Sequence, residues 1–293
     1  MTDHHPHRRA LLAGGLSLGL GAGLAALAGP VLAAASEIVT VKVGERDVDL
    51  AVWRPAKAEG VVIFSHGAGG SPLHLDGLFK AWNAAGFLVV GPIHVDSLSH
   101  PKHADYDLRA AFPLRLADLN AAAEWSAKAA PGLPRATSGH SYGSLMAQMR
   151  GGAIEQMIPA RDPATKAVVH FSSPGVIPAL MGPTAFSTLN VPLLSFTGDK
   201  DVVPGFVADW HDHLRAFETS APGDKHAWIG AGVDHVFGGA IRGQGDDPAQ
   251  TAAFAKAQAL SIAFLRATVL GDPAARAQLT AAKSDATAEI RTR

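Results

Sequence analysis

Ser141 is the residue whose surroundings best suit covalent chemistry. It lies between Gly139 and Gly143 in the segment Gly-His-Ser-Tyr-Gly, after a predicted strand and before a predicted helix. Glycine two residues to either side lets the chain turn sharply, which pushes the serine hydroxyl out of the backbone. The positive end of the following helix then points at the reacting carbonyl. This pattern is typical of a nucleophile elbow.

The same five-residue pattern occurs twice, so Ser141 needs support from other residues. The second match, at residues 15–19, lies in an apolar leader where no catalytic site could be built. A serine hydroxyl is a poor nucleophile at neutral pH and needs an imidazole to take its proton and a carboxylate to orient that imidazole. Downstream of Ser141, candidate groups are Asp199, Asp201 and His235.

Four sequence blocks together resemble an α/β-hydrolase, nearest to the dienelactone hydrolase-like and chlorophyllase-like serine esterases. They are Ser65-His-Gly-Ala-Gly-Gly-Ser71, Gly139-His-Ser-Tyr-Gly143, Gly198-Asp-Lys-Asp-Val-Val-Pro204 and the turn at His235. The resemblance implies a mostly parallel eight-stranded sheet with helices on both faces and a small or absent lid. It also implies a triad of Ser141, Asp201 and His235, in the chain order of that fold.

The family position of the acid, three residues after the glycine and before a Val/Pro turn, favours Asp201. Asp199 is the alternative acid and would otherwise be a loop or capping residue. Two backbone N–H groups must stabilise the oxyanion. One is expected from Tyr142, which follows the nucleophile, and the resemblance assigns the other to Ala68. A plain glycine-rich turn is the alternative reading of the loop at 66–70.

The remaining candidates among the 14 histidines have structural explanations. We expect His140 to pack under the elbow and His66 to hydrogen-bond within its loop. His170 would line the pocket or be a satisfied buried histidine. Asp234 should fix the turn before His235, because adjacent side chains rarely point at each other.

Two clusters of ligand-type residues, at 94–103 and 211–213, raise the possibility of a metal site. The first cluster fits better as a substrate-facing loop, since it follows a predicted strand and the loops at the carboxyl ends of such strands line the pocket. In the second, consecutive residues of a helix diverge and cannot converge on one ion. We therefore expect no metal and no cofactor.

Residues 1–35 predict an export signal. Paired arginines, Arg8 and Arg9, precede an uncharged Leu/Ala/Gly stretch that ends in small residues. The arginine pair followed by x-Leu-Leu resembles a twin-arginine leader and implies a bacterial periplasmic or secreted protein. Cleavage is expected after Ala33 or Ala35, leaving no stable membrane anchor; an uncleaved anchor is the alternative.

The overall composition, net charge and cysteine content exclude several classes of function. A hydrophobic content of 47% suits a globular body, and a net charge of −1 gives no reason to expect a nucleic-acid partner. The chain has no cysteine, which excludes disulfides, thiolate metal sites and cysteine catalysis. The oligomeric state stays open.

Short apolar runs alternate with helical patterns, which predicts a single α/β domain over residues 36–293. Strands are expected near 37–43, 48–54, 61–65, 87–92, 135–140, 167–172, 192–197 and 226–230. Helices are expected near 74–85, 113–129, 142–153, 205–218 and 250–268. The polar, alanine-rich tail at 272–293 is expected to be a peripheral helix or disordered.

These features predict an exported serine hydrolase of carboxylic esters that acts through an acyl-enzyme. Two short segments, 94–112 and 174–190, are expected to cover the pocket. Phe112, Leu180 and Phe186 would form an acyl site or belong to the core. Short- or medium-chain esters are favoured, with polyester or lipid esters also open. The alternatives are an amide, peptide or thioester hydrolase with the same triad and a catalytically silent binding protein.

Overall fold

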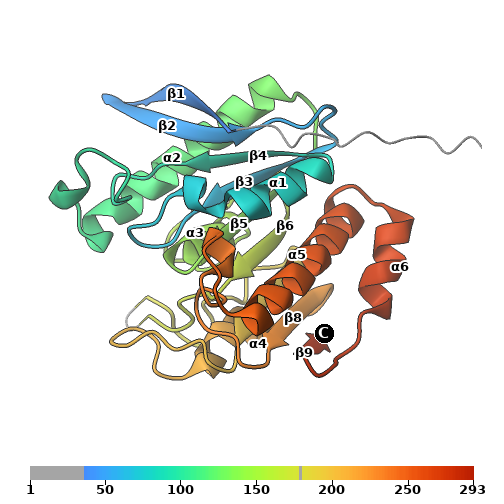
Figure 1. Ribbon diagram of the computed structural model, residues 1–293. Helices are drawn as coiled ribbons and strands as arrows, with labels where there is room; N and C mark the ends of the chain where they lie inside the picture. Colours follow the sequence, from blue (N-terminus) through green and yellow to red (C-terminus); the bar gives the residue numbers. More distant parts are fainter. Residues whose placement is uncertain (1–35, 178–179) are drawn as a thin grey trace, which may run out of the picture. The chain divides into compact units, whose positions relative to one another are not determined.

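The computed structural model describes residues 36–177 and 180–293, so the expected leader and its cleavage sites lie outside the described residues. These residues form a nine-stranded sheet in the order β1-β2-β4-β3-β5-β6-β7-β8-β9 (Figure 1). The strands are β1 (Glu37–Val43), β2 (Arg46–Trp53), β3 (Gly60–Ser65), β4 (Phe87–Pro92), β5 (Arg135–His140), β6 (Thr165–Phe171), β7 (Leu193–Gly198), β8 (Lys225–Gly230) and β9 (Ala288–Thr292). Strands β4, β3 and β5 to β8 are parallel, whereas β1, β2 and β9 pair antiparallel with their neighbours.

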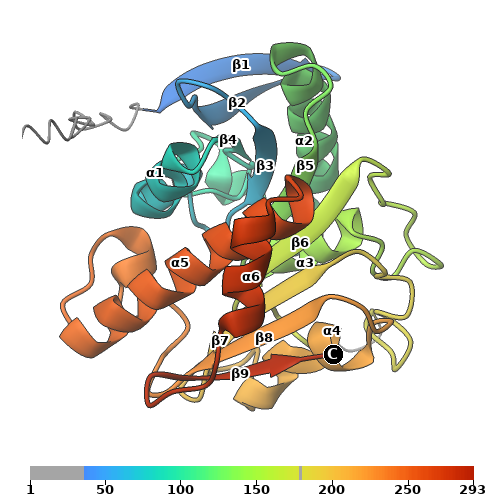
Figure 2. The same ribbon diagram turned by 90° about the vertical axis from the view of Figure 1, so that its right-hand side faces the viewer.

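Helices cover both faces of the sheet (Figure 2). They are α1 (Asp76–Ala84), α2 (Leu108–Ala129), α3 (Tyr142–Arg150), α4 (Arg215–Thr219), α5 (Pro248–Val269) and α6 (Pro273–Ala281). Successive strand residues point to opposite faces. In β3, Val62 and Phe64 pack with α1 and α5, whereas Val61 and Ile63 pack with α2 and α3. The continuous apolar run of β3 is therefore explained by two buried faces, and the predicted α/β architecture is confirmed.

The sheet has one strand more than the eight predicted, because the tail is ordered. Residues 272–293 form α6 and then β9, which pairs antiparallel with β8 along Ala288↔Gly230 to His226↔Thr292. Asp272 caps α6 through the backbone N–H groups of its first turn. Strand β9 has only five residues and an edge position, so its half-exposed sequence lacks the apolar run that marks the central strands.

The helix predicted at 205–218 is also wrong in its first part. Residues 203–209 form a turn in which Gly205 has φ +80° and Val203 bridges Val207. The side chain of Asp209 accepts a hydrogen bond from the His211 N–H and starts a 3₁₀ helix, η3 (Trp210–Leu214), which leads into α4. Helical structure therefore begins at Trp210, directly after its capping residue and five positions later than predicted.

The parallel strands bring distant parts of the sequence to one edge of the sheet. Their carboxyl ends lie at the same edge, where open α/β sheets place their ligand crevice. The loops after β3, β5, β7 and β8 begin at this edge and carry the residues at 66–70, Ser141, Asp201 and His235. None of the helices in the described part of the chain is long and apolar enough to cross a membrane.

Candidate active site

Ser141 occupies the strand-to-helix turn between β5 and α3. Its backbone has φ 52° and ψ −122°, a conformation that non-glycine residues rarely adopt. A Cβ atom at Gly139 would lie 2.2 Å from the carbonyl oxygen of Gly143, and one at Gly143 would lie 1.9 Å from that of Ser65. Both glycines are thus required by close backbone contacts, and the turn is the nucleophile elbow expected from the sequence.

The structure brings His235 and Asp201 together. His235 Nδ1 donates to Asp201 Oδ1 over 2.7 Å, and Thr197 Oγ1 donates to Asp201 Oδ2 over 2.8 Å. Burial alone would raise the pKa of the Asp201 carboxyl, but hydrogen bonds from His213 and His235 outweigh burial and hold this pKa well below its usual range. With Nδ1 donating to a carboxylate, His235 Nε2 is left as the proton acceptor.

The alternative acid, Asp199, has a different role. Its Oδ1 accepts a hydrogen bond of 2.8 Å from the backbone N–H of Gly232, so it joins the loops that follow β7 and β8. Asp234 also serves the backbone, since its Oδ1 accepts from the N–H groups of Val236 and Gly238. Neither carboxylate faces His235 Nδ1.

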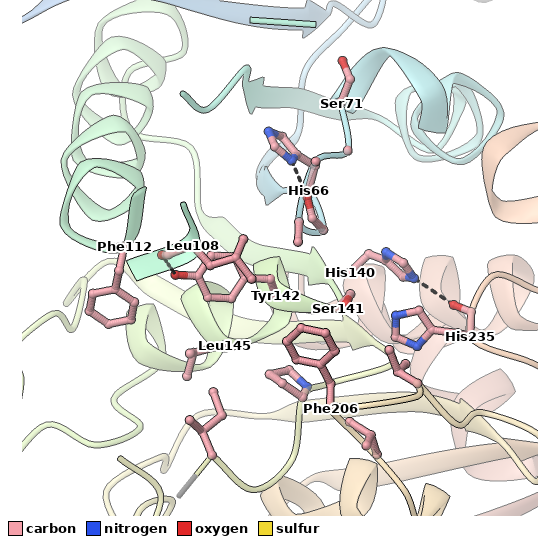
Figure 3. A pocket seen from close by; sticks show the side chains of 18 of the residues that line it. His66, Ser71, Leu108, Phe112, His140, Ser141, Tyr142, Leu145, Phe206 and His235 are labelled. Carbon is pink, nitrogen blue, oxygen red and sulfur yellow. Dashed lines mark hydrogen bonds between the residues drawn. The ribbon is translucent and has the colours of Figure 1, made fainter. Parts of the chain in front are cut away.

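Ser141 and His235 line the same cavity, and their side chains point toward a shared space (Figure 3). The hydrogen bonds among the described residues do not include one between the Ser141 hydroxyl and His235. The loop of His235 is held in place through its backbone carbonyl, which accepts from His140 Nε2 over 2.9 Å and from Ser172 Oγ over 3.3 Å. Catalytic hydrogen bonds of this kind often form only when substrate is bound.

The two expected oxyanion residues also border the cavity. Ala68 and Tyr142 both line it, and neither backbone N–H donates a hydrogen bond to another described residue. The loop approaches the nucleophile closely, because a Cβ atom at Gly67 would lie 3.3 Å from Ser141 Cβ. Free N–H groups beside a nucleophile can stabilise a developing oxyanion.

Arg115, which the sequence did not single out, holds both oxyanion segments. It is fully buried on α2 and donates to the carbonyls of His66 at 2.6 Å and Gly67 at 3.2 Å. Its guanidinium also lies 4.6 Å from the ring centroid of Tyr142. Asp96 balances the charge through hydrogen bonds of 2.7 and 2.8 Å. The loop after β3 and the start of α3 are therefore joined through one side chain.

A second Ser–His–Asp series lies beneath this loop. His94 Nε2 is 3.0 Å from Ser65 Oγ, and His94 Nδ1 is 2.9 Å from Asp118 Oδ2. All three residues are fully buried, so no substrate can reach the hydroxyl. Burial, with the nearby Arg115 charge, lowers the pKa of His94. This series has a structural role, and among the described residues those at 94–103 do not form a cluster of potential metal-ligand atoms.

Three further histidines, His66, His140 and His170, are buried packing groups. Burial, followed by the proximity of His235, lowers the pKa of His140 to about 3. His66 hydrogen-bonds within its loop, as expected, through Nδ1 and the Gly67 carbonyl at 2.7 Å. His170 is buried and does not line the cavity, and its Nε2 contacts Ser195 Oγ at 2.8 Å. Its Nδ1 has no hydrogen-bond partner among the described residues, so the histidine is buried as expected but only partly satisfied.

The segment 211–213 diverges as expected, but one of its members reaches the site. His211 is exposed and contacts Asp209, whereas His213 is buried with its Nε2 3.0 Å from Asp201 Oδ1. Potential ligand atoms of Asp201, His213 and His235 lie within 4.8 Å of one another. Both ring nitrogens of His213 face oxygen acceptors, so this histidine has no lone pair to offer an ion. No local sequence pattern marks this contact.

The cavity has a volume of about 1250 Å³ and a mainly apolar lining. It is bordered by both segments expected to cover it, and by the turn at 203–207, which was expected to be helical. Phe112 and Leu180 line the cavity, whereas Phe186 is buried in the core. At the rim, Phe206 is 75% exposed and Leu98 is 70% exposed. None of the described residues that line the cavity is an Asp or Glu.

Comparisons with known proteins agree with this architecture. No protein-family model and no curated protein matches the sequence. A dienelactone hydrolase from Anabaena variabilis matches with TM-score 0.57 and 22% identity, over 80% of this chain and 98% of that chain. A thermostable carboxyl esterase from Bacillus coagulans matches with TM-score 0.59 and 13% identity, over 80% and 99%. An esterase from an Arctic intertidal metagenomic library matches with TM-score 0.55 and 14% identity, over 80% of this chain and 93% of that chain. The strand order, the elbow and these matches show that the chain has the α/β-hydrolase fold.

Proposed function

We propose that this protein is an exported serine hydrolase that cleaves carboxylic esters. The observation that carries the proposal is the 2.7 Å hydrogen bond from His235 Nδ1 to the buried Asp201 carboxylate, beside a cavity that Ser141 also lines. An imidazole oriented by a carboxylate, next to an elbow serine, is the arrangement that acyl transfer requires. The esterases among the matched structures support the same reaction class.

In the proposed reaction, Ser141 Oγ attacks the ester carbonyl while His235 Nε2 takes its proton. The negative charge on the carbonyl oxygen is stabilised by the N–H groups of Ala68 and Tyr142. His235 then gives the proton to the leaving alcohol, and the acyl-enzyme forms. Water, activated by the same imidazole, releases the acid and restores the serine.

The cavity supports esters with a substantial apolar part. A volume of about 1250 Å³ is above the usual range for small-ligand pockets and has room for both acyl and alcohol groups. Exposed Phe206 and Leu98 extend the apolar lining to the rim. A surface of this kind suits medium-chain, lipid or polyester substrates as well as short esters.

The central experiment compares Ser141→Ala with Ser284→Ala, an exposed serine near the C-terminus that does not line the cavity. We expect Ser141→Ala to reduce kcat on a short p-nitrophenyl ester by at least about 10³-fold, because no nucleophile remains. Labelling by a fluorophosphonate probe should disappear in this variant alone. Unchanged turnover of Ser141→Ala would contradict the proposal.

The same purified protein separates the alternatives. Matched ester and amide substrates of one acyl group would reveal an amidase or peptidase, and a thioester would test the third possibility. A binding protein without catalysis would leave Ser141 unlabelled. Export is tested by fractionating a bacterial host and measuring the intact mass, which should correspond to cleavage after Ala33 or Ala35. An exported protein that still begins at Met1 would contradict cleavage.

A further inference from the structure

The carboxylate of Asp201 is shared by two imidazoles. Its Oδ1 lies 2.7 Å from His235 Nδ1 and 3.0 Å from His213 Nε2. His213 Nε2 is also 2.8 Å from the backbone carbonyl oxygen of Asp201. His213 comes from η3, and the centroid of its ring lies 6.0 Å from that of the cavity-lining His235. The catalytic acid therefore has a second nitrogen partner that the reaction itself does not use.

The contacts of His213 determine its protonation state. Nδ1 contacts the carbonyl oxygen of Ser173, and Nε2 contacts the carbonyl and carboxylate oxygens of Asp201. A carbonyl oxygen can only accept a hydrogen bond, and so can an ionised carboxylate. Both ring nitrogens must therefore carry a hydrogen, which makes His213 a buried imidazolium. Burial alone would lower its pKa, but the hydrogen bond and charge of Asp201 outweigh burial and raise the pKa.

The other charged or titratable groups described around Asp201 and His213 do not supply the positive charge that His213 carries. His140, from β5, and His170, from β6, both have a pKa lowered to about 3, chiefly by burial, and are neutral. Arg242, from the short 3₁₀ helix η4 (Ala240–Arg242), lines the cavity but is exposed to solvent, which screens it. Among the described residues, His213 is thus the buried cation against Asp201.

We propose that His213 is a positioning residue whose protonated ring fixes Asp201 and takes up part of its negative charge. The inference rests on the proposed function, in which His235 must be neutral to accept the proton of Ser141. A carboxylate that faced His235 alone would favour the protonated, inactive form of that imidazole. The cation at His213, which contacts the same carboxylate oxygen, opposes this effect and keeps His235 able to act at lower pH.

The test is the pH profile of kcat/KM for His213→Gln on a soluble short ester. Glutamine retains an uncharged N–H donor in place of His Nε2 and removes the cation. We expect the midpoint of the acid limb to move to higher pH by about one unit, from the loss of one charge at this distance. A purely structural role would lower kcat at every pH without moving the limb, and that result would overturn the proposal.

His170→Gln is the matched control. His170 is also a buried histidine on the same side of the site, but it is neutral and does not contact Asp201. Its replacement should affect stability while leaving the acid limb where it is in the wild type. An equal shift in both variants would mean that general loosening, and not the charge of His213, moves the limb.

A second measurement needs neither a variant nor a substrate. The ring-nitrogen NMR spectrum of the ¹⁵N-labelled wild-type protein should show both nitrogens of His213 bearing hydrogens at pH 7. A neutral tautomer there would overturn the proposal even if His213→Gln fails to fold. Failure of ester hydrolysis with an imidazolium still present at position 213 would instead reject the proposed function.

Discussion

The hydrogen-bond partners of two nearby aspartates indicate which of them can serve the candidate base. Asp199 and Asp201 lie in the same loop after β7, and the sequence alone left both open. Asp201 is fully buried and accepts from His235 Nδ1, whereas Asp199 accepts from the Gly232 backbone. The side-chain geometry therefore favours Asp201, the same residue that the family position of the acid favours.

We predict that Asp201→Asn lowers kcat/KM by about 10⁴-fold, because an amide does not hold the imidazole in its catalytic tautomer. It should also lower the thermal unfolding midpoint, since the imidazolium of His213 loses its counter-charge. Asp199→Asn is the matched comparison and should keep kcat/KM close to the wild-type value. Kinetics on a soluble p-nitrophenyl ester and thermal unfolding measure both. Similar losses in the two variants would argue against Asp201 as the acid.

Some side chains of the candidate site could be predicted from the sequence and others could not. Ser141 and the His235 turn could be named as candidates because each belongs to a local pattern with a geometric cause. His213 and Arg115 were missed because they act through contacts with residues distant in the sequence. Arg115 reaches residues 49 positions away, and His213 reaches Ser173, 40 positions away. Nothing in the neighbouring residues of either one marks such a contact.

Secondary-structure elements likewise divide into those that a local sequence pattern predicts and those that depend on distant contacts. The buried strands β3 and β4 were predictable because parallel strands covered on both faces are continuous apolar runs. Strand β9 was missed because its stability comes from pairing with β8 and from the packing of Ile290 on the core. The helix predicted from residue 205 failed because Gly205 and the cap at Asp209 determine where the chain can begin a helix.

The joining of elements by Arg115 leads to a further prediction. Arg115→Met should lower kcat more than it changes KM, because the loop that carries Ala68 would lose two backbone anchors. We expect a loss of about 10- to 100-fold, less than the deletion of an oxyanion donor itself. Leaving Asp96 buried without its partner should also destabilise the fold by about 3 to 5 kcal/mol. Steady-state kinetics and denaturant unfolding separate the two effects.

Arg135→Met provides the control for that variant. Arg135 also forms a two-point ion pair, with Asp162, but at the start of β5, at the opposite edge of the sheet from Ser141. Its loss should lower stability without lowering kcat. If Arg135→Met and Arg115→Met reduce kcat equally, the positioning role of Arg115 is rejected.

The folded chain as a whole contains a set of buried histidines whose titration must affect stability. Burial is the first cause of the lowered pKa values of His66, His94, His140 and His170. Below the ordinary histidine pKa of 6.5, the unfolded chain therefore binds more protons at these positions than the folded chain does. The free energy of unfolding therefore falls as the pH decreases through 6.5. His213 acts in the opposite direction, because its raised pKa gives stability that is complete below 6.5 and is lost at higher pH.

We predict that stability decreases between pH 7 and pH 5.5, and that His170→Gln reduces the size of this decrease. With a pKa of about 3, His170 is neutral at both pH values in the folded chain. A histidine whose pKa in the folded chain is about 3 contributes about 1 kcal/mol to the difference between these two pH values. Urea unfolding at the two pH values, in wild type and variant, measures the contribution of His170 directly. The variant is expected to be less stable at pH 7 through lost packing, yet to lose about 1 kcal/mol less on acidification, since it has one fewer histidine to titrate on unfolding. An identical decrease in both proteins would mean that the His170 imidazole already takes up a proton in the folded state, which its buried position and its contact with Ser195 argue against.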